Sequence, residues 1–180
     1  MPLKVKIFLW QISNDKLQNA TTLKHRGWRG SHLCCLCQRP ETIDHILFQC
    51  SLSTFFWTGI SEALGWPGRP KTWEDWCLSW VPSKCKMPKR LSMFLFAGMA
   101  WALWNTRNKM AIESIFPNNG LQPLFVGLGF LQRWTPLLKV ADRDKIRELV
   151  EVLKAWATNV TPAAIDLSDV GFIYLSAVVL

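Results

Sequence analysis

Apolar residues recur at helical spacing along most of this chain. Near its start, Val5 is followed by Phe8 three positions later and by Leu9 four positions later, which places them on one face of a helix over residues 3–10. The alternating lysines of the same stretch would also suit a strand. We favour helix because apolar residues continue at helical spacing beyond it.

A second helix is expected to follow at once. Asn14 or Asp15 can cap its first turn, and the helix should run to about His25. Gly27 or Gly30 can then adopt the left-handed backbone conformation that ends a helix.

The same periodicity predicts further helices, separated by Pro- and Gly-rich turns such as residues 65–72. They are expected at residues 51–65, after Thr72, at 89–115, at 121–139 and at 142–157. The chain is therefore predicted to be mainly α-helical.

Neither a membrane span nor a signal peptide is expected. The longest apolar run, Leu91 to Trp104, is 14 residues long, whereas a bilayer needs about 20. The apolar run near the start, Ile7 to Trp10, is too short for a secretory signal. We therefore expect a nuclear or cytoplasmic protein whose six cysteines are reduced.

Composition and charge indicate an aromatic core and a polyanionic partner. The 180 residues include 11 Trp and 10 Phe, and the net charge is +8. Residues 1–140 contain 17 basic and 7 acidic residues, a net charge of +10, whereas residues 141–180 have a net charge of −2. A basic body suggests nucleic acid as the partner, although a solvated basic surface is the simpler alternative.

The chemistry is concentrated in one cysteine- and histidine-rich segment. Cys34, Cys37, His45 and Cys50 have the spacing C-x2-C-x7-H-x4-C. A two-residue gap lets the chain turn so that both sulfurs reach one Zn²⁺, and backbone amides in that turn can donate to the thiolates. A one-residue gap suits this turn poorly, so Cys35 is predicted to be a spare.

The spacing also constrains the local fold. His45 should lie on a short helix that begins near Glu41, and Cys50 lies about 140° further round an ideal helix. That helix must therefore end or bend before Cys50. Three cysteines and one histidine leave no ligand position for water, so we predict one structural Zn²⁺ and no catalytic metal.

Other interpretations of these residues remain open. The thiols could be buried without metal, or a Cys/His pair could act as a nucleophile, although no third orienting group is evident. His32 could replace His45 as the ligand. Cys77 and Cys85 lack paired spacing and are expected to be buried as small apolar residues.

The motifs that carry a family resemblance occur in order over about residues 2–60. They are Pro2 to Trp10, Leu17, Leu23, Arg26-Gly27, Cys34-x2-Cys37, Glu41-Thr42, His45 to Phe48, Cys50 and Trp57. This segment resembles the zinc-binding domain found downstream of the reverse transcriptase in plant LINE-type (non-LTR) retrotransposons. The later residues Trp101, Trp104, Arg107 and Asn108 resemble the segment that often follows that domain.

The resemblance implies a zinc module that helps a retroelement protein to hold its RNA or its target DNA. No polymerase motif is present, so polymerase activity is not carried over, and we do not expect an enzyme. We divide the chain into a zinc-stabilised CCHC helical module (1–62), a Trp/Pro-rich linker with a short helix (63–88), a helical extension (89–160) and an apolar tail (161–180).

Two functions are predicted. The first is binding of RNA or single-stranded DNA, with phosphates meeting basic side chains and Trp28 stacking on an unpaired base. The expected contact residues are Lys16, Lys24, Arg26, Trp28, Arg29 and Arg39. The alternative is a protein-interaction or vestigial structural fragment, with Trp73, Trp76 and Trp80 packing on a protein partner.

Overall fold

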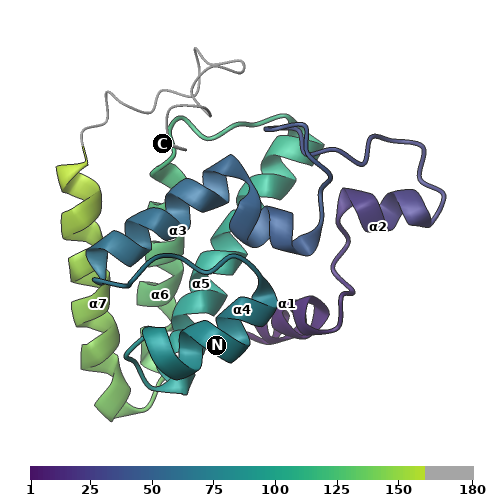
Figure 1. The fold of residues 1–180 in the computed structure, drawn as a ribbon. Helices are drawn as coiled ribbons and strands as arrows, with labels where there is room; N and C mark the ends of the chain where they lie inside the picture. The colour runs from purple at the N-terminus through teal and green to yellow at the C-terminus, as the bar shows by residue number, and fades with distance from the viewer. Residues whose placement is uncertain (161–180) are drawn as a thin grey trace.

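The computed structural model describes residues 1–160, and these form helices joined by turns and loops (Figure 1). The predicted apolar tail at 161–180 lies outside the described residues. Within them the only β pairing is an isolated bridge between Leu33 and Pro40, which confirms a mainly α-helical chain. The helices are α1 (Leu3–Ser13), α2 (Ala20–His25), η1 (His45–Gln49), α3 (Ser51–Ala63), α4 (Trp73–Asp75), η2 (Trp76–Lys84), α5 (Lys89–Asn108), η3 (Lys109–Glu113), α6 (Gln122–Trp134), η4 (Thr135–Leu137) and α7 (Val140–Asn159).

Helix α5 runs through the middle of the molecule, with the other helices around it (Figure 1). It is apolar on nearly all sides, as expected of a helix that is covered on every face. Its residues Leu95, Phe96, Ala97, Met99, Ala100 and Ala102 have no exposed surface. On one side, Phe8 of α1 packs edge-on against Trp101, with ring centroids 5.1 Å apart.

An aromatic cluster centred on Phe96 joins segments that are far apart in the sequence. The ring centroid of Phe96 lies 5.9 Å from that of Phe48, 6.0 Å from Trp57 and 5.2 Å from Trp76. All four of these residues are fully buried. One apolar core therefore crosses the proposed boundaries at residues 62 and 88, and the division into domains stays a prediction from sequence.

Helices α5 and α6 approach closely because glycine lies at the crossing on both sides. A Cβ at Gly98 would lie 2.6 Å from a methyl carbon of Leu131, and a Cβ at Gly127 would lie 2.6 Å from the sulfur of Met99. Helix α7 then packs on α6 and α3, where Trp156 lies against Gly59. These contacts hold the second half of the chain against the first.

The second helix begins later than predicted. Neither Asn14 nor Asp15 caps it, since Asp15 has a φ of 52° and α2 starts at Ala20. The N-cap is Asn19, whose Oδ1 accepts a hydrogen bond from the Thr22 amide at 2.8 Å. Sequence alone favoured the earlier Asn-Asp pair, whereas in the structure Asn14 and Asp15 form the turn that ends α1, and the buried Leu17 lies between that turn and α2.

The ends of the other helices follow the sequence more closely. Gly27 has a φ of 87° after α2, as predicted. The helix expected over 89–115 continues from α5 into the π-helical turn η3 and stops where Ser114 adopts a left-handed φ of 57°. Within residues 1–160, no helix has both the length and the apolar character needed to cross a membrane.

Truncation of Phe96 is expected to destabilise the whole chain, because four aromatic rings contact this one side chain. We expect Phe96→Ala to lower the free energy of unfolding by about 3–5 kcal/mol, as measured by urea denaturation. The exposed Leu78, replaced by Ala, is the control and should change it by less than about 0.5 kcal/mol. Equal effects of the two substitutions would contradict the aromatic core.

Candidate metal centre

The first two candidate ligands lie on a tight loop between His32 and Glu41. The loop is closed by backbone hydrogen bonds from Cys34 N to Arg39 O at 2.8 Å and from Glu41 N to His32 O at 2.9 Å. Gln38 takes a left-handed φ of 57° so that the chain can reverse. The Leu36 amide donates to the Cys34 sulfur at 3.4 Å, which confirms the amide-to-thiolate contact predicted from the two-residue gap.

The other two candidate ligands flank a π-helical turn. Thr42 caps the helical stretch that starts at residue 43 and leads into this turn, since its hydroxyl accepts from the His45 amide at 3.1 Å. The Cys50 amide donates to the His45 carbonyl at 2.7 Å, five residues back, and Cys50 then leaves the helix with a ψ of 147°. A π turn returns the fifth residue to the side of the first, which is how the helix bends as the spacing required.

The wider turn exposes three consecutive carbonyl oxygens, and each is bound by a side chain. Ser53 donates to Ile46 O, the indole of Trp57 donates to Leu47 O at 2.6 Å, and Arg69 donates to Phe48 O at 3.0 Å. Buried carbonyls without partners are costly, so these donors stabilise the π turn. The first two come from α3 and the third from the loop at 65–72, which fixes the turn from two directions.

Together these elements bring the four predicted ligands to one point. The ligand atoms of Cys34, Cys37, His45 and Cys50 all lie within 4.8 Å of one another. A tetrahedral Zn²⁺ with Zn–S bonds of about 2.3 Å would place two sulfurs about 3.8 Å apart. The sulfurs of Cys34 and Cys50 are 3.9 Å apart, and the Cys37 sulfur lies 3.2 Å from His45 Nε2. The donor set and its spacing therefore fit one zinc ion.

The four candidate ligands shift one another's pKa values. Hydrogen bonds from Cys35, Cys37 and Cys50 lower the pKa of the Cys34 thiol far below its usual value. Hydrogen bonding with that thiolate and burial raise the pKa of Cys50. Burial alone lowers the pKa of His45, but hydrogen bonds to Cys34 and Cys37 outweigh it and raise the pKa to about 9. The groups thus retain protons that a divalent cation would displace.

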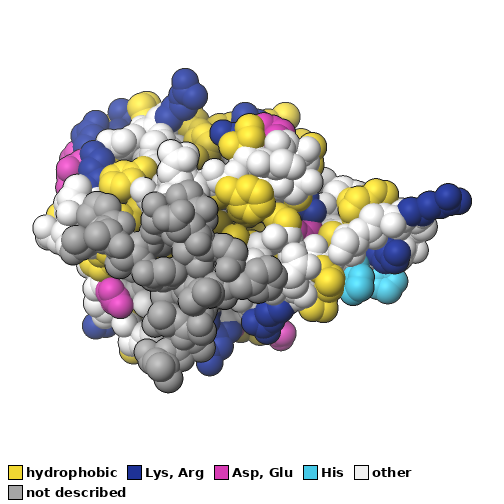
Figure 2. Space-filling view, turned by 90° about the horizontal axis from the view of Figure 1, so that it is seen from above, with side chains coloured by type: hydrophobic (Ala, Val, Ile, Leu, Met, Phe, Trp, Pro, Cys, Tyr) yellow, Lys and Arg dark blue, Asp and Glu magenta, His cyan; other side chains and the backbone are white. Residues whose placement is uncertain are grey.

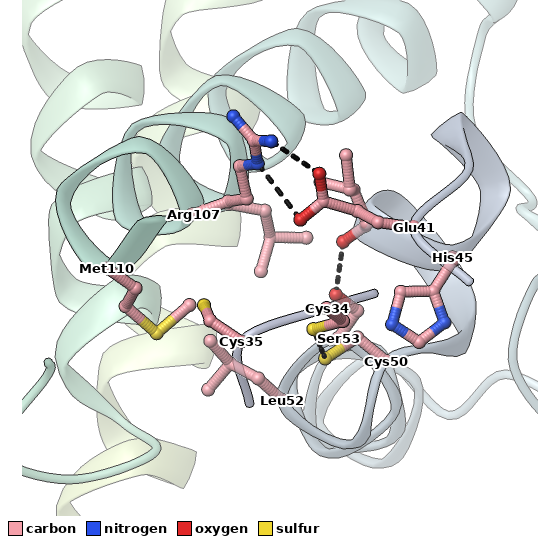
Figure 3. Close-up of a pocket in the computed structure, with 11 residues that line it drawn as sticks. Cys34, Cys35, Glu41, His45, Cys50, Leu52, Ser53, Arg107 and Met110 are labelled. Atoms are coloured by element: carbon pink, nitrogen blue, oxygen red, sulfur yellow. Dashed lines mark hydrogen bonds and ion pairs between the residues drawn. The ribbon is translucent and has the colours of Figure 1, made fainter. Parts of the chain in front are cut away.

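Cys35 lies beside the centre but outside the ligand group. It lines a small pocket with Leu52 and Met110, and its side chain projects to the opposite side from His45 (Figure 3). The other candidates stay apart: His25 and His32 are exposed, Cys77 is half-buried, and Cys85 is buried and bonded to Ser92. All six cysteines are free thiols.

A buried ion pair lies beside the pocket, and sequence reasoning did not predict it. The guanidinium of Arg107 binds both carboxylate oxygens of Glu41, through Nε to Oε2 at 3.0 Å and through Nη2 to Oε1 (Figure 3). Their side chains are 12% and 2% exposed. Glu41 Oε1 also accepts from the Ala20 amide at 2.9 Å. Both residues belong to the resemblance motifs, but only the fold shows that they meet.

The six predicted nucleic-acid contacts lie on a projecting part of the molecule. We call residues 16–39 the basic arm, since they include five Lys or Arg and no Asp or Glu. Side chains of Lys, Arg and His gather at the projecting end that carries α2 (Figure 2). All six predicted contact residues are exposed: Lys16, Lys24, Arg26, Trp28, Arg29 and Arg39.

Comparison with known proteins gives one match. Residues 1–57 match the family model described as zinc-binding in reverse transcriptase. The match covers 57 of the 180 residues, a little under a third, and includes all four candidate ligands. Neither a curated protein nor a solved structure matches the chain. No catalytic domain is recognised, and the plant LINE origin stays a prediction.

Metal content should distinguish the ligands from the spare cysteine. We expect purified protein to contain one zinc per chain by elemental analysis, and Cys35→Ser to retain it. Cys37→Ala should lose it, because three ligands close the tetrahedron poorly. Loss of zinc from Cys35→Ser with retention by Cys37→Ala would show that the ligand assignment is wrong.

Removal of the metal should have a local effect first. A structural zinc supplies on the order of 10 kcal/mol or more in small modules. We expect a chelator to remove hydrogen-exchange protection from residues 1–60, while the helices beyond residue 88 retain part of theirs. Unchanged protection in residues 31–50 after complete zinc removal would contradict a structural role for the ion.

The Glu41–Arg107 pair should behave as a unit. Arg107→Met leaves a buried carboxylate without its partner, and we expect a loss of about 3–5 kcal/mol in unfolding free energy. Adding Glu41→Gln removes the uncompensated charge and should restore most of that loss. Additive losses in the double variant, measured by urea denaturation, would contradict the coupling.

Proposed function

We propose, from the premise that residues 1–57 are a zinc-binding module of the reverse-transcriptase type, that one structural Zn²⁺ shapes this module to bind nucleic acid. The observation that carries the proposal is the convergence of four ligand atoms at the base of the basic arm. Cys34, Cys37, His45 and Cys50 would hold the ion as three thiolates and one imidazole. This set leaves no open coordination position, so the ion would supply structure and no chemistry.

The centre and the arm are mechanically connected. Cys34 and Cys37 belong to the arm itself, and Glu41 anchors its other end through the Ala20 amide and the Thr21 hydroxyl. The ion pair of Glu41 with Arg107 then fixes this anchor to α5. Closing the metal loop would therefore hold the basic side chains in one arrangement relative to the helical body.

Charge and exposure support a phosphate backbone as the partner. Five cationic side chains within residues 16–39 face no acidic residue of the same segment, and each is exposed. Such side chains gain affinity for nucleic acid by releasing counterions from phosphates. A strong dependence of binding on salt is therefore expected.

The position of Trp28 favours a single strand. Its side chain is 48% exposed, and its ring lies against Gly30, where a Cβ would approach to 2.1 Å. Because residue 30 is glycine, the indole can lie close to the backbone, and the rest of the ring stays in solvent. Exposed aromatic rings next to basic side chains suit stacking on unpaired bases of RNA or single-stranded DNA.

A protein partner is a second candidate, favoured by one observation on α1. Leu3, Ile7 and Trp10 are 72%, 49% and 58% exposed and follow one another at helical spacing on its outer face. Trp76 and Trp80, which were predicted to pack on a protein partner, are instead buried in the core of this chain. A protein would therefore dock on α1.

Nucleic-acid binding is tested by fluorescence anisotropy with a labelled 24-nucleotide single-stranded RNA. We expect Arg26→Glu/Arg29→Glu to weaken binding at least ten-fold near 0.1 M salt. The slope of log affinity against log salt should fall by about 1.4, because each lost phosphate contact on a single strand accounts for about 0.7. Trp28→Ala should weaken binding by about 1–3 kcal/mol.

The matched control is Lys6→Glu/Lys71→Glu, which changes the net charge equally at exposed positions outside the arm. It should weaken binding much less than the arm variant. Zinc content and circular dichroism should be unchanged in both. Absence of binding by the wild-type protein, or equal losses in the two variants, would reject the basic arm as the binding site. Loss of a co-purifying protein in Trp10→Ser, with no RNA binding, would favour the second candidate.

A further inference from the structure

A second basic surface lies away from the metal centre and is built from two distant segments. Residues 84–90 contain four basic residues and no acidic ones. Residues 139–147 contain four basic and two acidic residues. We call these two segments together the α5/α7 basic surface, because they surround the first turns of α5 and α7.

One ion pair joins the two segments. The guanidinium of Arg90 donates from Nε and Nη2 to the two carboxylate oxygens of Asp142, at 2.7 and 2.6 Å. The side chain of Asp142 is 3% exposed, whereas that of Arg90 is 61% exposed. The carboxylate is therefore covered by the arginine, and its charge is not available to a partner.

The remaining charges of this surface are almost all positive. Asp144 is paired with Arg147, so six cations of this surface form no ion pair with any residue of the described range 1–160. They are Lys84, Lys86, Lys89, Lys139, Arg143 and Lys145. The pKa of Asp142 is lowered first by its hydrogen bonds with Arg90, and Lys139 and Lys145 also contribute, so both lysines lie near the ion pair.

The local backbone adds to this field. Arg143 donates to the carbonyls of Leu138 and Pro136, which are neutral and leave its charge uncancelled. Helices α5 and α7 also begin here, and neither first turn has a side-chain cap. The first turn of α7 holds Asp142, whereas that of α5 holds no acidic residue, so the positive end of the α5 dipole adds to the charge of this surface.

Helix α5 sets the distance between the two basic regions. Arg90, near its start, binds Asp142, and Arg107, near its end, binds Glu41 at the base of the basic arm. The two arginines are 17 positions apart in this helix, which corresponds to about 25 Å between their Cα atoms along the helix axis at about 1.5 Å per residue. Because α5 is one continuous helix packed in the core, the fold sets this separation.

We propose that the α5/α7 basic surface is a second phosphate-binding surface, and that one nucleic-acid strand contacts it and the basic arm together. This rests on the proposed function, since the arm provides the first contact. A strand that reaches both surfaces gains affinity through effective concentration, and a strand too short to span about 25 Å does not. Unpaired nucleotides advance about 3.4 Å each when stacked and up to roughly 6 Å each when extended, so a strand of about three nucleotides cannot span this distance.

The test compares RNA strands of 3 and 24 nucleotides by fluorescence anisotropy. Lys89→Glu/Lys145→Glu keeps the Arg90–Asp142 pair and should weaken binding of the 24-nucleotide strand about ten-fold. Binding of the 3-nucleotide strand should change less than two-fold, since it reaches only the arm. Lys89→Gln/Lys145→Gln, which removes charge without reversing it, should give a smaller loss in the same direction.

Controls separate this inference from the function of the arm. Arg26→Glu/Arg29→Glu should weaken both strands, and Lys6→Glu/Lys71→Glu should weaken neither by more than about two-fold. Binding of both lengths that depends only on the arm would overturn the second surface while the proposed function stands. Absence of RNA binding by the wild type would overturn both. Unchanged RNA binding with loss of binding to phosphatidylserine vesicles would overturn the inference in favour of an anionic membrane.

Discussion

Three thiols and an imidazole within 4.8 Å of one another form the constraint on which the metal-binding part of the structure depends. The loop that carries Cys34 and Cys37 is short, and its apolar residues pack only in a small cluster with Leu52 and Met110, apart from the main core. The sulfurs of Cys34 and Cys50 lie 3.9 Å apart, close enough that two bare thiolates would repel each other. A divalent ion would offset this repulsion and would stabilise the loop, because its binding energy becomes folding energy.

The metal centre is connected to the central helix α5 by hydrogen bonds and an ion pair. Glu41 accepts from the Ala20 amide on one side and binds Arg107 of α5 on the other, so the loop, the arm and the central helix share one carboxylate. The π turn that positions His45 and Cys50 is in turn held by donors from α3 and from Arg69. Removal of a bound ion should therefore loosen the packing around α5 as well as the loop.

The sequence was sufficient where a feature depends on local spacing. The C-x2-C turn, the bend required between His45 and Cys50, and the amphipathic helices α3 and α7 all follow from residue periodicity. It was insufficient where a feature depends on distant segments. Asn19 replaces the expected cap, because Asn14 and Asp15 belong to the turn that ends α1. The pairing of Glu41 with Arg107 spans 66 residues, and no local pattern encodes it.

X-ray absorption at the zinc edge of the purified protein tests the central claim most directly. The account predicts one zinc with three sulfur neighbours at about 2.3 Å and one nitrogen neighbour at about 2.0 Å, with no water in the first coordination shell. A shell of oxygen and nitrogen atoms only, or protein that folds fully without zinc, would contradict it.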